Sequence, residues 1–218
     1  LALLGLLIGT TIAIPLGIFS ALKRNTIADY GIRSLAIAFL AVPTFWLATI
    51  VIAIIIPKLG LPPLPIRYHG LFENPIENIK QLWVPSMILG LALAGIVMRI
   101  TRSQILEALQ QDYVRTASSK GLRKFTVINR HVMKNALIPI ITIIGVQISL
   151  VISGSVVLET IFVLPGLGLR LIRALGERDI PVILGINLFV AIFVILANLF
   201  IDIAYSALDP RLKLSRKI

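Results

Sequence analysis

The sequence predicts an all-α protein, a polytopic bundle of helices that span a membrane. The chain of 218 residues is 57% hydrophobic and only 14% charged, with a mean hydropathy of +0.96, so it is more apolar than a typical soluble domain. Its charges also leave five long uncharged runs, each close to the roughly 20 residues that cross a hydrocarbon layer of about 30 Å. A membrane β-barrel would instead need alternating strands of about 10 residues.

The uncharged runs give the expected spans in chain order. They are Leu1 to Leu22, Ser34 to Pro57, Gln81 to Met98, Asn135 to Leu158 and Ile180 to Ile201. Each should be a helix, because in lipid every backbone donor and acceptor must be satisfied within its own segment. No linker divides the spans, so we expect residues 1–218 to form a single transmembrane domain.

The basic residues predict the orientation of these spans. Most of the 21 Lys and Arg residues lie in the first and third loops and in the C-terminal tail, and short cytoplasmic loops carry the excess of positive charge. We therefore expect a multi-pass protein of a prokaryotic inner membrane, with the N-terminus of this fragment outside and the C-terminus in the cytoplasm. The net charge of +11 follows this pattern and faces anionic lipid, so it does not indicate a nucleic-acid partner.

The first span begins without Met, a basic region or a cleavage site. This disfavours a signal peptide and predicts that a preceding, sixth helix is missing.

Within the first span, Gly5 and Gly9 form a G-x-x-x-G pair, which is either a close helix contact or a chance occurrence in apolar sequence. After the fourth span, Leu169, Ile172 and Leu175 predict a short amphipathic helix that lies along the membrane surface.

The sequence offers no catalytic or metal site. Cysteine is absent, and the two histidines, His69 and His131, fall in loops on opposite sides of the membrane. The serines of Ser153 to Ser155 have no His or Lys at the same depth to act as a base. No glycine-rich loop precedes a Lys-Ser or Lys-Thr pair, so any ATP would be bound and hydrolysed by another subunit. We expect no cofactor and no enzymatic activity in this chain.

Polar residues within spans mark either packing between helices or a pathway. The candidates are Gln147 and Ser153 in the fourth span and Asn187, Asn198 and Asp202 in the fifth. The last three share one face of a helix by their spacing. Interhelical hydrogen bonding and a water-lined route both remain open for them.

The third loop, about residues 108–137, is the most distinctive segment. In "DYVRTASSKG" Asp112 can cap a helix, Tyr113 to Lys120 make about two turns, and Gly121 supplies a left-handed stop. Lys120 suits the negative end of the helix dipole. A second helical stretch, about Val127 to Leu137, completes a projecting hook. Its basic residues could hold the loop against anionic lipid, but the small residues around Ala117 favour a surface that another protein approaches closely.

This loop resembles the cytoplasmic signature of the dipeptide and oligopeptide type of ABC importer permease. The match comprises "DYVRTASSKG" followed by "RHVMKNALIP". Ala117 and Gly121 also fit the general pattern of such permeases, whereas Arg115 and Thr116 replace its Glu and Ala. "VVLETIFVLPGLG", from Val156, and "ALDPR", from Ala207, resemble the B-type subunit, and the resemblance runs from about Leu1 to Lys213.

The resemblance implies a type I ABC importer permease fold and a set of partners. These are a second homologous permease subunit, two cytoplasmic ATP-binding subunits and an extracytoplasmic solute-binding protein, in the lipid bilayer. The residues implied in coupling to the ATPase are Asp112, Tyr113, Arg115, Thr116, Ala117, Lys120 and Gly121. Peptides are the expected solute. Nickel or another small solute, a non-transporting subunit that recruits a cytoplasmic partner, and a secondary transporter remain alternatives.

Overall fold

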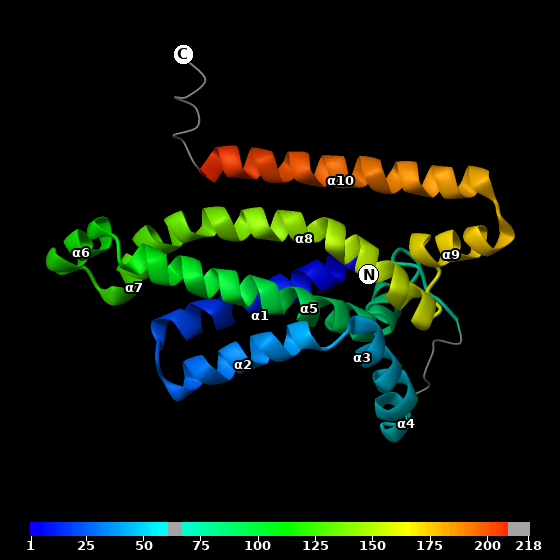
Figure 1. Cartoon of the computed structure of the whole chain (residues 1–218), viewed down its shortest axis with the longest axis horizontal. Helices are drawn as coiled ribbons and strands as arrows, with labels where there is room; N and C mark the ends of the chain where they lie inside the picture. Colours follow the sequence, from blue (N-terminus) through cyan, green and yellow to red (C-terminus); the bar gives the residue numbers. More distant parts are fainter. Residues whose placement is uncertain (61–66, 209–218) are drawn as a thin grey trace, which may run out of the picture.

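The computed structural model describes residues 1–60 and 67–208, with Asp202 and residues 204–208 described by their backbone alone. The part of the chain that it describes is helical, and its long helices run roughly side by side along one axis (Figure 1). The helices are α1 (Ala2–Leu22), α2 (Ile27–Ala41), α3 (Thr44–Ile50), α4 (Ile56–Lys58), α5 (Pro75–Leu109), α6 (Asp112–Ser119), α7 (Lys124–Val127), α8 (Met133–Ile161), α9 (Leu167–Glu177) and α10 (Ile180–Leu208), with π-helical turns η1 (Val51–Ile55) and η2 (Ile128–Val132).

Four of these helical segments are long and apolar enough to cross a membrane, and a bent pair gives a fifth. The bent pair corrects the predicted second span, Ser34 to Pro57. Residues 27–41 and 44–58 meet at 90° instead of forming one helix. Val42 is extended, with φ of −90° and ψ of 117°, as expected for a residue that precedes proline. Pro43 therefore ends α2, and the chain turns away from the direction of α2 while α3 still packs against α5 and α8 (Figure 1).

The helix α5 forms the centre of the bundle and is longer than the predicted span Gln81 to Met98. It has 35 residues, begins at a cap in which Asn74 accepts a hydrogen bond from the Glu77 N–H, and packs against α1, α2 and α8. The uncharged run underestimates it because charged residues near both ends, such as Lys80 and Arg102, continue the same helix.

The helix α1 packs on α5 through small residues at every fourth position. Gly5, Gly9, Ala13 and Gly17 are all buried, and a Cβ atom built on Gly9 would lie 2.6 Å from the carbonyl oxygen of Gly90. The two backbones are thus in direct contact. This confirms the packing interpretation of the G-x-x-x-G pair.

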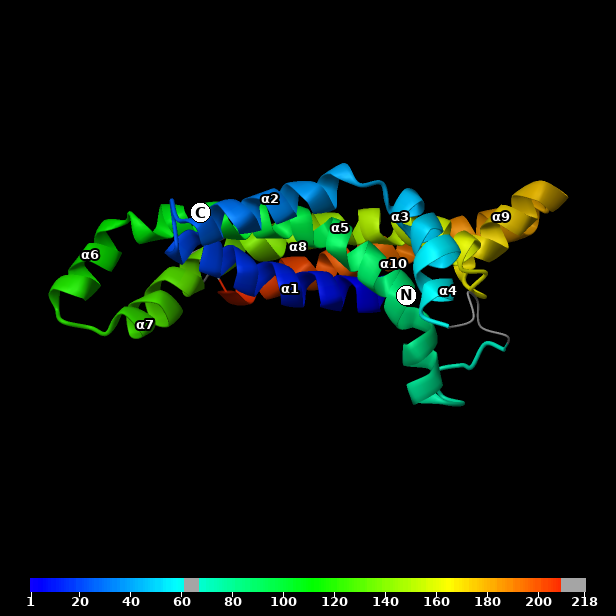
Figure 2. The ribbon, with the colours of Figure 1, turned by 90° about the horizontal axis from the view of Figure 1, so that it is seen from below.

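The chain returns from the third loop through one continuous helical segment, residues 124–161. The predicted second stretch, about Val127 to Leu137, belongs to the same helical segment as the fourth span, and Pro139 lies inside α8 without ending it. Seen from below, α6 and α7 project together beyond one end of the bundle, opposite α9 (Figure 2).

The predicted amphipathic helix forms as α9 and packs against α8 and α10. Its start is held by Glu159 of α8, whose carboxylate accepts hydrogen bonds from the backbone N–H groups of Gly168 at 2.7 Å and Leu169 at 3.4 Å. A carboxylate at a helix N-terminus also meets the positive end of its dipole. Gly168 and Ala174 are buried, whereas Ile172 and Leu175 remain exposed on the chain.

Candidate coupling hook and translocation cavity

The hook, residues 108–137, is built from α6, a glycine elbow and the start of the segment that continues into α8. Gly121 has a φ of +75°, in the left-handed region that glycine adopts without strain. A Cβ atom at this position would meet no atom within 4 Å. Glycine is therefore required at the elbow because of its positive φ and not because a side chain would clash. The sequence predicted this left-handed position.

The predicted cap at Asp112 is wrong. Gln111 occupies the N-cap position, no side chain makes a capping hydrogen bond, and Asp112 is the first residue of α6. The Asp112 carboxylate lies 3.6 Å from the Arg115 guanidinium, with both side chains exposed, and the Asp112 carbonyl accepts a 2.9 Å hydrogen bond from the Thr116 hydroxyl. Asp112 thus meets the positive end of the helix dipole without capping it.

Ala117 does not lie on the open surface of the hook. It is 6% exposed, as is Val114 one turn earlier, because these two residues form the inner face of an amphipathic helix that packs against α7 and η2. The other predicted coupling residues, Asp112, Tyr113, Arg115, Thr116, Lys120 and Gly121, are exposed. Sequence reasoning missed two apolar side chains beside them, Leu122 at 42% and Phe125 at 75% exposure.

A cavity of about 310 Å³ lies near the break between α2 and α3. Its walls come from that junction, from α5 and from α8, and they comprise Phe39, Leu40, Val42, Pro43, Thr44, Leu89, Ala92, Leu93, Ile96, Gln147, Leu150, Val151 and Gly154. Of the four predicted pathway residues whose side chains the structure describes, Gln147 alone is among these wall residues. The residue is 4% exposed, and its amide has no hydrogen-bond partner among the residues that the structure describes.

Three of the other predicted pathway residues, Ser153, Asn187 and Asn198, do not join Gln147. Ser153 is exposed, and its hydroxyl donates a 3.0 Å hydrogen bond to the Ser149 carbonyl of its own helix. Asn187 and Asn198 are exposed on α10, and the Asn187 amide donates to the Ile183 carbonyl at 2.9 Å. The side chain of Asp202 lies outside the described residues.

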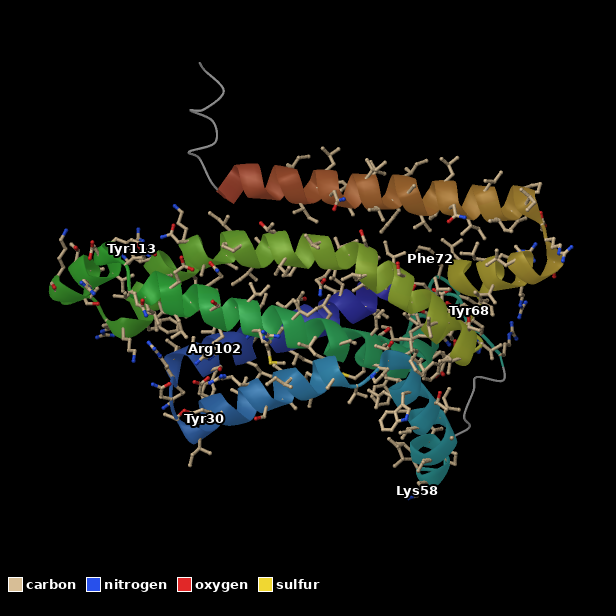
Figure 3. The ribbon with its side chains drawn as sticks, viewed as in Figure 1. Tyr30, Lys58, Tyr68, Phe72, Arg102 and Tyr113 are labelled. Carbon is tan, nitrogen blue, oxygen red and sulfur yellow. The ribbon has the colours of Figure 1, made fainter. Side chains whose placement is uncertain are left out.

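An ion pair near the base of the hook was not predicted. Asp29, at the start of α2, is fully buried and accepts hydrogen bonds from Arg102 of α5 at 2.8 and 2.7 Å. It also accepts from the Ser20 hydroxyl of α1 at 2.6 Å and the Asn25 N–H at 3.0 Å. Figure 3 shows Arg102 at the same end of the bundle as Tyr113 of the hook. This cluster therefore joins three helices where the hook begins.

Comparison with known proteins places these features in a family. Residues 13–214 match the model described as "Binding-protein-dependent transport system inner membrane component". A peptide transport system permease protein of Brucella abortus is 39% identical over 213 residues, which cover 98% of this chain and 68% of the relative. The dipeptide transport system permease protein DppB is 36% identical in Bacillus subtilis, over 100% of this chain and 68% of the relative, and 34% identical in Escherichia coli, over 98% and 69%.

The fold agrees with a solved transporter. A chain of the MetNI methionine ABC transporter in inward facing conformations superposes with a TM-score of 0.73 at 15% identity, over 95% of this chain and 91% of that chain. The likeness at that identity concerns the fold alone. The sequence matches extend over nearly the whole chain and include the hook. The chain belongs to the family of inner membrane components of binding-protein-dependent transport systems.

Proposed function

We propose that this chain is the transmembrane permease subunit of an ABC importer for peptides, which an extracytoplasmic solute-binding protein delivers. The observation that carries the proposal is the projecting hook, with its exposed residues and its glycine elbow, in a chain whose relatives are named peptide and dipeptide permeases. The substrates of those relatives, together with the match to the peptide-type signature, make peptides the first solute to test.

The mechanism we propose is alternating access driven by two separate ATPase subunits. ATP would bring the ATPases together and move the hooks of the two permease subunits, so that the spans re-orient and release the solute inside. A shift of this kind needs ATP and the loaded binding protein to favour one state by a few kcal/mol. The chain itself would supply the cavity walls and the mechanical connection from the hook to α5 and α8.

Site-directed cross-linking tests the role of the hook. Because the chain contains no cysteine, single cysteines can be introduced on the exposed face of α6 as Thr116→Cys and Ser119→Cys. Each should form a cross-link to an ATPase subunit in the assembled transporter, and the yield should change when ATP is added. Thr142→Cys in the exposed part of α8 is the control and should form none. No ATPase adduct from either hook position would contradict the coupling proposal.

Transport by the reconstituted complex tests the solute and the class of function. Mass spectrometry of the ligand in the cognate binding protein should find peptides, and the loaded binding protein should stimulate both ATP hydrolysis and peptide uptake. Nickel or another small solute in the binding protein would overturn the peptide assignment alone. If the rate of ATP hydrolysis does not change when loaded binding protein is added, a non-transporting subunit that recruits a cytoplasmic partner is favoured.

A further inference from the structure

The cavity near the break between α2 and α3 combines apolar walls with the amide of Gln147. Leucine, isoleucine, valine and phenylalanine side chains form most of its surface, and Thr44 and Gln147 are its polar members. Its volume, about 310 Å³, falls near the lower end of the roughly 300–1,000 Å³ typical of ligand pockets. The space is therefore sufficient for a small solute or a short part of a longer one.

The amide of Gln147 opens onto the cavity although the residue as a whole is largely buried. Among the described residues, the fully buried side-chain atoms without a hydrogen-bond partner are His69 Nδ1 and Thr101 Oγ1, so the Gln147 amide is in contact with the space of the cavity and can be hydrated there. Gln147 is 4% exposed, lines the cavity and has no partner within the described chain. By contrast, the exposed Asn187 amide is already bonded to its own helix. The Gln147 amide is thus available to a group that enters the cavity.

We propose that Gln147 binds the backbone amide of a peptide in transit, an inference that rests on the proposed peptide import. A carboxamide has both a donor N–H and an acceptor oxygen, and it can pair with the N–H and C=O groups that every peptide carries. Apolar walls accept varied apolar side chains of the solute. The wall residues include no carboxylate, imidazole or thiol, so this cavity does not suit a divalent metal ion.

The first experiment compares two solutes on the intact wild-type complex. Dialanine and its ester analogue, in which oxygen replaces the peptide N–H, are each supplied on saturating amounts of binding protein whose loading is measured separately. The maximal uptake rate should be about tenfold higher for dialanine, the factor expected for one hydrogen bond between the solute and the site. Equal rates for the two solutes would overturn the inference while leaving peptide import intact.

The second experiment replaces the amide. Gln147→Met keeps the length of the side chain and removes both hydrogen-bonding groups. It should lower the maximal rate for dialanine about tenfold more than the rate for the ester, which keeps only the C=O as a partner for the amide, and so abolish the preference between them. Thr142→Val is the matched control on α8, because its hydroxyl is exposed and bonded to the Ile138 carbonyl; it should behave as the wild type.

Co-purification of the complex shows whether a second permease subunit, and not the solute, contacts Gln147. If Gln147→Met prevents co-purification of the second permease subunit, or slows both solutes equally, the amide serves the protein interface or the fold and the inference is wrong. An unchanged dialanine rate in the variant would overturn it as well. If the wild-type complex imports no peptide at all, the proposed function fails first, and this result is distinct from every outcome above.

Discussion

At the scale of single residues, Arg102 and Asp29 form the interaction with the largest expected effect on stability. Asp29 is fully buried and Arg102 is 20% exposed. Removing one partner leaves a buried charge without compensation, which costs about 3–5 kcal/mol. We therefore expect Arg102→Ala to lower the free energy of unfolding by this amount, measured by denaturant unfolding of the purified protein in detergent.

Two further variants isolate the cause. Arg67→Ala removes the exposed pair between Arg67 and Glu73, whose side chains are 74% and 51% exposed, and should cost less than about 1 kcal/mol. A double variant, Asp29→Asn with Arg102→Met, leaves no unpaired charge and should lose less stability than Arg102→Ala alone. If Arg102→Ala lowers the free energy of unfolding as little as Arg67→Ala does, the buried pair does not stabilise the fold as expected.

At the scale of elements, the contact between α1 and α5 depends on the absence of side chains. Leucine at Gly9 would place its Cβ atom 2.6 Å from the Gly90 carbonyl oxygen, so the helices would have to separate. We expect Gly9→Leu to prevent the bundle from forming, as seen by loss of the monodisperse peak in size-exclusion chromatography. Gly31→Leu is the control: a Cβ atom there meets nothing within 4 Å, and the variant should elute as the wild type.

How far the elements could be predicted depends on the range of the forces that define them. The uncharged runs located the spans, because the cost of a charge in lipid acts on each segment separately. They could not identify Pro43 as a helix end while Pro139 lies within a helix, since neighbouring helices decide whether the freed carbonyl is satisfied. Gly121 was predictable because its constraint is local to the backbone.

The site was less predictable than the spans because contacts between helices that are distant in the sequence determine it. Ala117 is buried because α6 packs against α7 and η2, and no local pattern fixes that packing. Asp29 and Arg102 are 73 positions apart in the sequence, and their pairing follows from how α2 docks on α5. The one acidic residue in a basic first loop, Asp29, was a signal that sequence reasoning did not use.

At the scale of the whole molecule, the two ends of the bundle should face opposite sides of the membrane. Figure 3 places Tyr113 of the hook at one end and Phe72 at the other. We expect a cysteine at the fully exposed Phe72 to react with a membrane-impermeant maleimide on intact cells. A cysteine at the exposed Asn129, in the hook, should react only in inside-out vesicles. The reverse pattern would overturn the orientation that the basic residues predict.

The glycine contact between α1 and α5 has a mechanical consequence. Side chains at an ordinary helix interface can change rotamer and absorb part of a displacement, whereas two backbones in contact have no such compliant layer. Gly9 and Gly17 keep α1 against α5 along its length, and Arg102 fixes the start of α2 to the same helix. Motion of the hook at the end of α5 would therefore move α1 and α2 with it, so that the three helices act as one rigid body.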